Sequence, residues 1–253
     1  MNKIIILSFI LSSYLIAQDL DPLKSAARKD GETFKQIISQ YRTRGKITVL
    51  GQKTKFEELD FSYVTEWRTK DTLKENFEYV RDKRFLKSSD QSELQRRSTW
   101  LYPDNGCYAR ASMMIQNLKE KKVKKPWKVF IFGNLKVETD NSLKGYVKWW
   151  YHVVPIVTVD DEPYVLDPAI DPSEALSLKD WALRQIEDLD EVTFSICGPN
   201  AYSPSSNCLD FEDPDMKKVL RDQERFLPME WSRQEKLERD PYEVLGDNPP
   251  WLN

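Results

Sequence analysis

The sequence predicts an α+β fold, in which a helix that carries a cysteine packs on an antiparallel sheet. Pro103–Gly106 is a strong turn sequence. Ala109–Lys121 follows it and is rich in the residues that favour helices. Three runs further along, 127–132, 145–159 and 163–167, are rich in Trp, Tyr, Val and Ile, as strands are. A helix followed by consecutive strands is typical of the α+β class.

The strand predicted at 145–159 is expected to lie in the centre of the sheet. Trp149, Tyr151 and Val153 alternate with Trp150 and Val154, so both faces of this strand are apolar. A strand that is apolar on both faces is buried on both. The acidic triplet 160–162 then reads as a solvated turn, after which the chain returns along 163–167 as the second strand of a hairpin.

Cys107 lies where the turn meets the helix, and this position affects its chemistry. The positive end of a helix favours the thiolate, which is the nucleophilic form of a cysteine. Free N–H groups at the same helix end could stabilise an oxyanion, and the N–H of Cys107 is one candidate donor. Taken alone, Cys107 favours the alternative of an inert, buried thiol in a well-packed helix.

His152, the one histidine of the chain, lies in the middle of the long strand. If 146–159 and 163–167 form a hairpin, position 152 faces roughly position 167 to 170, which puts Asp167 opposite the histidine or on its diagonal. Such neighbours are about 5 to 8 Å apart by Cβ, close enough for an imidazole–carboxylate pair. The alternatives are a satisfied core histidine and a plain turn aspartate.

Together these residues predict a catalytic triad of Cys107 as nucleophile, His152 as base and Asp167 as the group that orients the imidazole. A cysteine on a helix, followed by a histidine and an aspartate on adjacent strands, is the papain-like and transglutaminase-like arrangement. No cofactor is expected, because the chain has no phosphate-binding or dinucleotide glycine motif. One histidine and no C-x-x-C make a zinc site improbable.

The charge and the N-terminus indicate an exported protein that does not bind nucleic acid. The net charge is -3, with no clustered basic surface. Residues 1–17 read as a signal peptide: Lys3 precedes an apolar run too short to span a bilayer comfortably, and Ala17 suits cleavage before Gln18. We therefore expect a secreted or periplasmic protein that has no membrane anchor after the signal is removed.

Three cysteines in an exported protein leave one unpaired. Cys197 and Cys208 flank a loop-rich segment that gains from a cross-link, so they are expected to form a disulfide. Cys107 would then be the free thiol. Three free thiols in a reducing compartment are the alternative, which the predicted signal argues against.

Four segments are expected along the chain. After the signal peptide, 18–94 is a helical lobe or a possible pro-segment, 95–210 is the catalytic core, and 211–253 is a helical extension. The other elements predicted are helices at 32–44, 69–86 (capped by Thr72 and Glu75), 175–186 (capped by Ser177 and Asp180), 216–226 and 230–238, and strands at 47–50 and 192–197.

The residues just described resemble those of a known protein family. Asn105–Ala111 (Asn-Gly-Cys-Tyr-Ala-Arg-Ala), Trp150–Val153 and Tyr164–Pro168 are similar to the bacterial protein-glutaminase family, over roughly 95–200. The segment Leu176–Trp181 fits as well. The resemblance implies a transglutaminase-like core and the three triad residues as catalytic. It departs at Asn105, where family members often carry Asp, and at Ser112, where some carry His.

The resemblance also implies the reaction, namely hydrolysis of glutamine side chains in proteins to glutamate, through a thioester and with release of ammonia. Glutamine-bearing proteins or peptides are then the expected partners. Trp100 or Trp150 could wall the acyl tunnel, and Arg110 could pair with a carboxylate, although core and surface roles explain these residues equally well. A peptidase, a transglutaminase, a cell-wall amidase and a non-enzymatic binding module are the alternatives.

Overall fold

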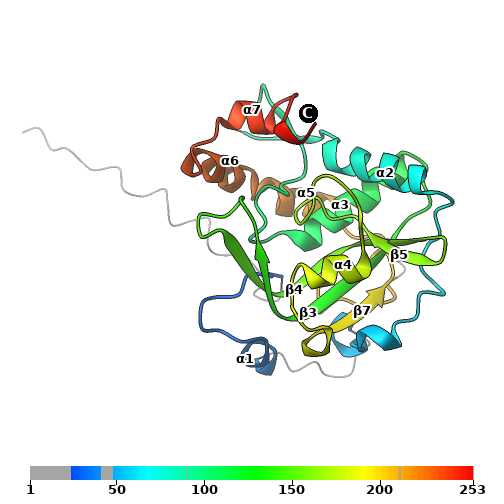
Figure 1. Cartoon of the computed structure of the whole chain (residues 1–253). Helices are drawn as coiled ribbons and strands as arrows, with labels where there is room; N and C mark the ends of the chain where they lie inside the picture. Colours follow the sequence, from blue (N-terminus) through cyan, green and yellow to red (C-terminus); the bar gives the residue numbers. More distant parts are fainter. Residues whose placement is uncertain (1–23, 41–47, 90, 211, 253) are drawn as a thin grey trace, which may run out of the picture.

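The protein is an α+β protein, as the sequence predicts (Figure 1). The structure, a computed structural model, describes residues 24–40, 48–89, 91–210 and 212–252. One five-stranded antiparallel sheet has the order β6-β5-β4-β3-β7. Its strands are β3 (Trp127–Glu138), β4 (Tyr146–Val159), β5 (Glu162–Val165), β6 (Leu176–Ser177) and β7 (Thr193–Cys197).

Strand β4 lies at the centre of this sheet and is buried on both faces, as the sequence predicts. β3 pairs with it along most of its length, and β5 pairs only with its last four residues, 156–159. The β4 edge that faces away from β3 is therefore not covered by β5 from Tyr146 to Pro155. β3 runs six residues beyond the predicted end at 132, across an irregularity at Gly133 and Asn134.

The helices in chain order are α1 (Phe34–Ser39), α2 (Lys70–Asp82), α3 (Cys107–Glu120), α4 (Leu178–Leu183), α5 (Met216–Glu224), α6 (Leu227–Lys236) and α7 (Pro241–Leu245). Helix α3 packs on β4, and the apolar residues of its first half share one core cluster with both long strands, whereas Met114 and Leu118 pack in a cluster with α2. Short 3-10 turns lie at 49–52, 56–58, 189–191 and 250–252, and a small hairpin joins β1 (Leu86–Lys87) to β2 (Gln95–Arg96).

The helix caps confirm one prediction and correct another. Ser177 caps α4 by accepting a hydrogen bond from the N–H of Asp180 at 3.1 Å. In α2 the capping residue is Thr69, which accepts from the N–H of Thr72 at 3.1 Å, so the predicted capping box at Thr72 is wrong. The helix itself begins at Lys70, one residue after the predicted start at 69, because Thr69 is its cap and not its first residue.

The N-terminal elements are shorter than predicted. α1 begins at Phe34 because Thr33 and Gln36 form a capping box, and the predicted end of this helix at 44 lies outside the described residues. A strand was predicted at 47–50, but 49–52 is a 3-10 turn. Thr48 caps that turn by accepting from the N–H of Gly51 at 3.2 Å, which is turn chemistry rather than strand chemistry.

The C-terminal helices enclose a second apolar cluster, which contains Trp100, Leu101, Val244 and Leu245. A buried ion pair joins Arg96 to Glu230 at 2.5 Å, so α6 is held against the chain that precedes α3. In Figure 1, α6 and α7 lie on the side of the molecule away from β7. The boundaries 18–94, 95–210 and 211–253 stay predictions.

The predicted disulfide is confirmed, since Cys197 is bonded to Cys208 and Cys107 is free. The bond joins the end of β7 to the loop that follows it. No helix in the described part of the chain is long and apolar enough to cross a bilayer. The predicted signal peptide, 1–17, lies outside the described residues.

Candidate active site

Cys107 is the first residue of α3, as the turn sequence predicts. Gly106 is the N-cap and has a positive φ of 83°, which glycine adopts without strain. A Cβ at this position would lie 2.7 Å from Cε2 of Phe226, closer than two carbons can approach. Both the backbone conformation and the packing against Phe226 therefore require glycine directly before the cysteine.

Arg110 holds the turn before Cys107 in place. Its Nη1 donates to the carbonyl oxygen of Asn105 at 2.6 Å, and makes longer contacts of 3.4 Å to the carbonyls of Thr99 and Tyr102. The side chain is buried, so the surface interpretation of this arginine is wrong. Its hydrogen-bond partners among the described residues are backbone carbonyls rather than the carboxylate that we considered.

His152 and Asp167 form the expected pair, with His152 Nε2 lying 2.7 Å from Asp167 Oδ2. The register Ile156↔Val165 puts Asp167 on the diagonal of His152, as predicted. The same carboxylate oxygen accepts a hydrogen bond from the indole N–H of Trp181 at 2.8 Å, and Oδ1 accepts from the N–H of Ala169 at 3.2 Å. Asp167 is thus fixed from three sides.

The electrostatics favour an imidazolium beside a carboxylate. Burial lowers the pKa of His152, but the Asp167 charge and hydrogen bond, together with the Cys107 thiol, outweigh it and raise the pKa to about 9. Burial raises the pKa of Asp167, yet His152 and Trp181 bring it below its usual value. Nδ1 of His152 has no hydrogen-bond partner among the described residues, so this nitrogen is available on the side away from Asp167.

Two tryptophans form the walls around the imidazole, and neither is one that the sequence analysis selected. Trp149 stacks on His152 at a centroid distance of 4.3 Å, and Trp181 stacks on it at 5.7 Å. Strict alternation puts Trp149 and His152 on opposite faces of β4. The two rings nevertheless stack, at the point where β3 carries an irregularity opposite Trp150.

The two tryptophans named as candidates lie elsewhere. Trp100 packs edge-on against Trp251 at 4.6 Å in the C-terminal cluster. The indole N–H of Trp150 donates to the carbonyl oxygen of Ser25 at 2.7 Å. Trp150 therefore contacts an N-terminal segment that the sequence analysis did not connect with the site.

That segment, residues 24–28, lies along the β4 edge that β5 leaves uncovered. Ala27 forms an antiparallel bridge with Trp149, flanked by bonds from Trp150 N–H to Ala26 O at 3.0 Å and from Arg28 N–H to Lys148 O at 2.9 Å. We call residues 24–28 the covering segment. It fills the strand position beside the residues that lead to His152.

The covering segment also contacts the turn that carries Cys107. The N–H of Ala26 donates to Oδ1 of Asn105 at 3.2 Å, and Asn105 Nδ2 donates to Ser25 Oγ at 2.9 Å. The Tyr151 hydroxyl donates to the carbonyl oxygen of Lys24 at 2.5 Å. Ala26 is fully buried, and the exposed fractions of Cys107 and His152 are 2% and 1%, so the candidate site is closed to solvent.

The fold and the site can now be compared with known proteins. Residues 73–185, which include Cys107, His152 and Asp167, match the model of a family described as glutaminase. The predicted resemblance to the protein-glutaminase family is confirmed by this match, over somewhat less than half of the chain. No curated protein matches the chain.

Solved structures of protein-glutaminases are also similar. A crystal structure of protein-glutaminase is 21% identical, covers 62% of this chain and 85% of its own, and has a TM-score of 0.47. The NMR structure of protein-glutaminase from Chryseobacterium proteolyticum is 24% identical over 60% of this chain and 84% of its own, also at 0.47. A crystal structure of pro-protein-glutaminase is 22% identical over 67% and 62%, at 0.48.

Proposed function

We propose that the protein is a cysteine amidohydrolase that deamidates glutamine side chains in proteins. The observation that carries the proposal is the buried His152–Asp167 pair, 2.7 Å apart, in the same site as a free cysteine that begins a helix. The match to the glutaminase family, over the stretch that contains all three residues, supports glutamine as the substrate.

The proposed reaction has two steps. The Cys107 sulfur attacks the carbon of the side-chain amide, the C–N bond breaks, and the imidazolium of His152 gives its proton to the departing ammonia. Water then attacks the thioester while His152 takes up a proton, which yields glutamate and the free thiol. Asp167 keeps Nε2 of the ring occupied, so that Nδ1 is directed to the reacting groups.

The N-terminal region is proposed to act as a pro-segment. The covering segment lies on the open edge of β4 and bonds to Asn105, two residues before Cys107. Because Cys107 is 2% exposed, a protein substrate reaches the sulfur only after this segment has moved. The indication of a signal peptide in residues 1–17 and the disulfide support export of the protein before such a movement.

The deciding experiment incubates a glutamine-rich protein with the variant Ala26→Glu, in which the covering segment is expected to be displaced, and uses the same variant with Cys107→Ala as the control. We expect release of ammonia and a gain in substrate mass of about one unit for each glutamine converted, with no reaction by the control. Dominant peptide cleavage would indicate a peptidase, lysine cross-links a transglutaminase, and amide loss from cell-wall fragments alone a cell-wall amidase. Each of these products would refute deamidation while retaining the triad.

A binding module without catalysis is tested separately by alkylation of Cys107. A thiol activated by His152 reacts with iodoacetamide well below pH 8 once the site is open, whereas an inert core thiol does not. Absence of reaction at pH 6 in a variant that displaces the covering segment would favour the binding module.

A further inference from the structure

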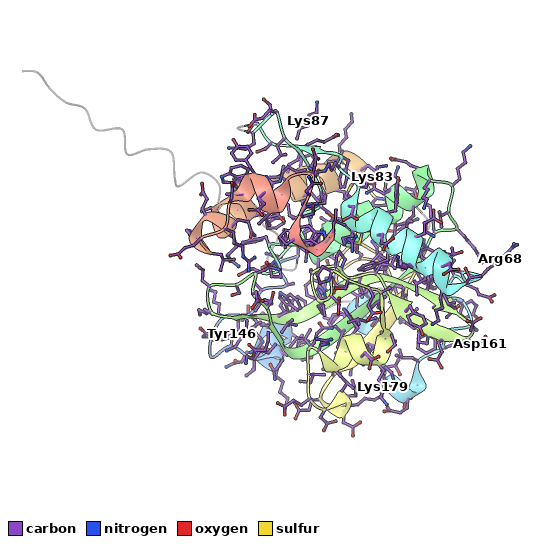
Figure 2. All side chains as sticks on the ribbon, turned by 45° about the horizontal axis from the view of Figure 1, so that its top comes forward. Arg68, Lys83, Lys87, Tyr146, Asp161 and Lys179 are labelled. Carbon is purple, nitrogen blue, oxygen red and sulfur yellow. A yellow bond between two sulfur atoms is a disulfide. The ribbon has the colours of Figure 1, made fainter. Side chains whose placement is uncertain are left out.

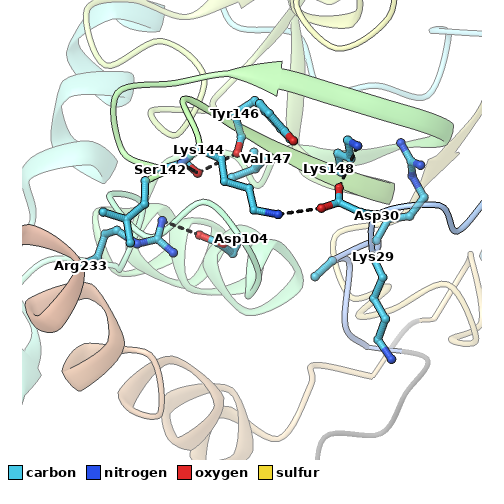
Figure 3. A pocket seen from close by; sticks show the side chains of 12 residues that line it. Lys29, Asp30, Asp104, Ser142, Lys144, Tyr146, Val147, Lys148 and Arg233 are labelled. Carbon is cyan, nitrogen blue, oxygen red and sulfur yellow. Dashed lines mark hydrogen bonds and ion pairs between the residues drawn. The ribbon is translucent and has the colours of Figure 1, made fainter. Parts of the chain in front are cut away.

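Two lysines hold one carboxylate beside the candidate site. Nζ of Lys144 lies 2.7 Å from Oδ2 of Asp30, and Nζ of Lys148 lies 2.9 Å from Oδ1 (Figure 3). Lys144 belongs to the turn between β3 and β4, Lys148 to β4 itself, and Asp30 follows the covering segment by two residues. The two ammonium groups thus bind a carboxylate that comes from a different part of the chain.

These residues line a cavity of about 290 Å³ that is rich in positive charge. Arg28, Lys29, Lys144, Lys148 and Arg233 surround it, whereas its acids are Asp30 and Asp104. Asp104 is already paired with Arg233 at 2.9 Å. Within the described chain, Asp30 is the one ion-pair partner of Lys144 and of Lys148, so both lysines lose their counter-charge when Asp30 leaves.

The cavity and the turn of Cys107 are contacted by two positions of the N-terminal segment that are a fixed number of residues apart. Ser25 and Ala26 both bond to Asn105, at 2.9 and 3.2 Å, and Ala26 is the fully buried one of the two, so we take Ala26 as the position of the covering segment that faces the turn of Cys107. Asp30 lies four positions further along the chain. A substrate strand that takes the place of the covering segment on β4 would bring the same position to the lysine pair.

We propose that Lys144 and Lys148 form a specificity site for an acidic residue of the protein substrate, about four residues C-terminal to the glutamine. The proposal rests on the proposed function, because it places the substrate on the β4 edge that the covering segment occupies. The carboxylate of an aspartate or glutamate at that position pairs with the two ammonium groups, as the carboxylate of Asp30 does in this structure. A lysine or arginine there is repelled.

The expected preference is modest and sensitive to salt. The Lys144 side chain is 63% exposed and that of Lys148 25%, so water weakens both pairs. Two exposed pairs of this kind change kcat/KM by about threefold to tenfold. Because such charges are screened over about 10 Å at 0.1 M salt, the preference should shrink as salt is added.

The test uses the full chain with Ala26→Glu, which is expected to displace the covering segment by placing a charge at a buried position, and with Asp30→Asn, which removes the internal carboxylate. Its substrates are peptides with a single glutamine and with Asp, Asn or Lys four residues after it, and the readout is ammonia release at low salt. We expect kcat/KM to fall in the order Asp, Asn, Lys. Adding Lys144→Glu and Lys148→Glu should reverse this order. The change Lys87→Glu, at an exposed lysine in another part of the molecule (Figure 2), should leave it unchanged.

Equal rates for the three peptides, or a preference that survives the charge reversal, would overturn the lysine site and leave deamidation standing. If no peptide releases ammonia, protection of Cys107 from iodoacetamide by the same peptides decides. Stronger protection by the Asp peptide than by the Lys peptide would support the lysine site and count against deamidation. Equal protection, or none, would overturn the site as well.

Discussion

The His152 imidazole has an unusually high affinity for its proton, and this sets the alkaline limit of the proposed reaction. Its pKa of about 9 keeps the ring charged at neutral pH, ready to protonate ammonia. We expect kcat to fall as the pH rises through about 9. An alkaline limb centred near pH 6.5, the ordinary value for histidine, would contradict this.

The Asp167 carboxylate is expected to orient the imidazole rather than to hold the fold. Asp167→Asn keeps the shape of the side chain but presents a donor where Nε2–H needs an acceptor. We expect turnover to fall by about a hundredfold or more in a variant that still folds. Its unfolding midpoint in urea at pH 7 should be lower than that of the native protein, because Asp167 stabilises the charged imidazole. A variant that is unfolded under the assay conditions would indicate a structural role.

Lys128 is a fully buried lysine whose charge opposes folding. Its Nζ donates to Ser112 Oγ at 2.8 Å and to the carbonyl of Ala201 at 2.6 Å, and burial lowers its pKa to about 7. The unfolded chain, where the pKa is near 10.5, therefore binds more protons between pH 7 and 10.5. This residue makes the free energy of unfolding rise with pH over that range.

Lys128→Met should remove that rise, which is measurable by urea unfolding at pH 7 and pH 9. His152 acts in the opposite sense: its raised pKa gives stability that is complete below about pH 6.5 and is lost as the pH passes about 9. The comparison must therefore be between variant and native protein at each pH, with Lys87→Met as the exposed control. If the free energy of unfolding rises between pH 7 and pH 9 as much in Lys128→Met as in the native protein, the rise does not come from Lys128.

Among single residues, the sequence predicted those with distinctive chemistry but not the roles of the residues that hold them in position. Cys107, His152 and Asp167 could be found from a turn and a hairpin register. The role of Trp181 was missed, and Arg110 was named with the wrong partner, because a tryptophan and an arginine in a helix carry no local signal that they bind a carboxylate or three carbonyls. The capped helix at Ser177, which delivers Trp181 to Asp167, was the one available indication.

Among the elements, the strand β7 and its loop depend on the disulfide. Replacing Cys197 and Cys208 by alanine frees a short loop in the unfolded chain, which should lower the free energy of unfolding by about 3 kcal/mol. Urea unfolding of the double variant measures this change, and the native protein in reductant should shift by a similar amount. Because Cys107 is in a different element, its alkylation at equal folded fraction should not change.

Element types were predictable wherever the apolar period was long, and the ends were not. The two-sided apolar run identified β4 as the central strand, whereas caps decided the starts of α1 and α2. The 3-10 turn at 49–52 shows why short apolar runs mislead: Thr48 binds its own backbone three residues on. The continuation of β3 beyond 132 depends on its pairing with β4, a long-range contact that no local pattern reports.

For the whole molecule, closure of the site by the covering segment is the property to test. Ala26 is fully buried against the site, whereas its neighbour Ala27 is exposed. Ala26→Glu places a charge in an apolar setting and should displace the segment, whereas Ala27→Glu should not. We expect alkylation of Cys107 to accelerate at least about tenfold in the first variant only, since a loss of about 1.4 kcal/mol suffices for that factor.

The rate of alkylation is measured by mass spectrometry of the Cys107 peptide. Equal acceleration in both variants would show that displacement of the segment does not depend on the burial of Ala26. Unchanged rates in both would show that other parts of the chain close the site. The domain organisation at this scale could not be read from the sequence, because the contact between residues 24–28 and β4 spans more than a hundred positions.

The covering segment is covalently linked to the chain that it covers, and this linkage strengthens its binding. A tethered ligand has an effective concentration in the millimolar range, whatever the dilution of the protein. If the segment acts as the proposed pro-segment, we expect the few hydrogen bonds that Ser25, Ala26 and Arg28 make to suffice for such a tethered ligand. A single cut in the connection would turn it into a free peptide at the concentration of the enzyme itself, and dilution alone would then carry it away.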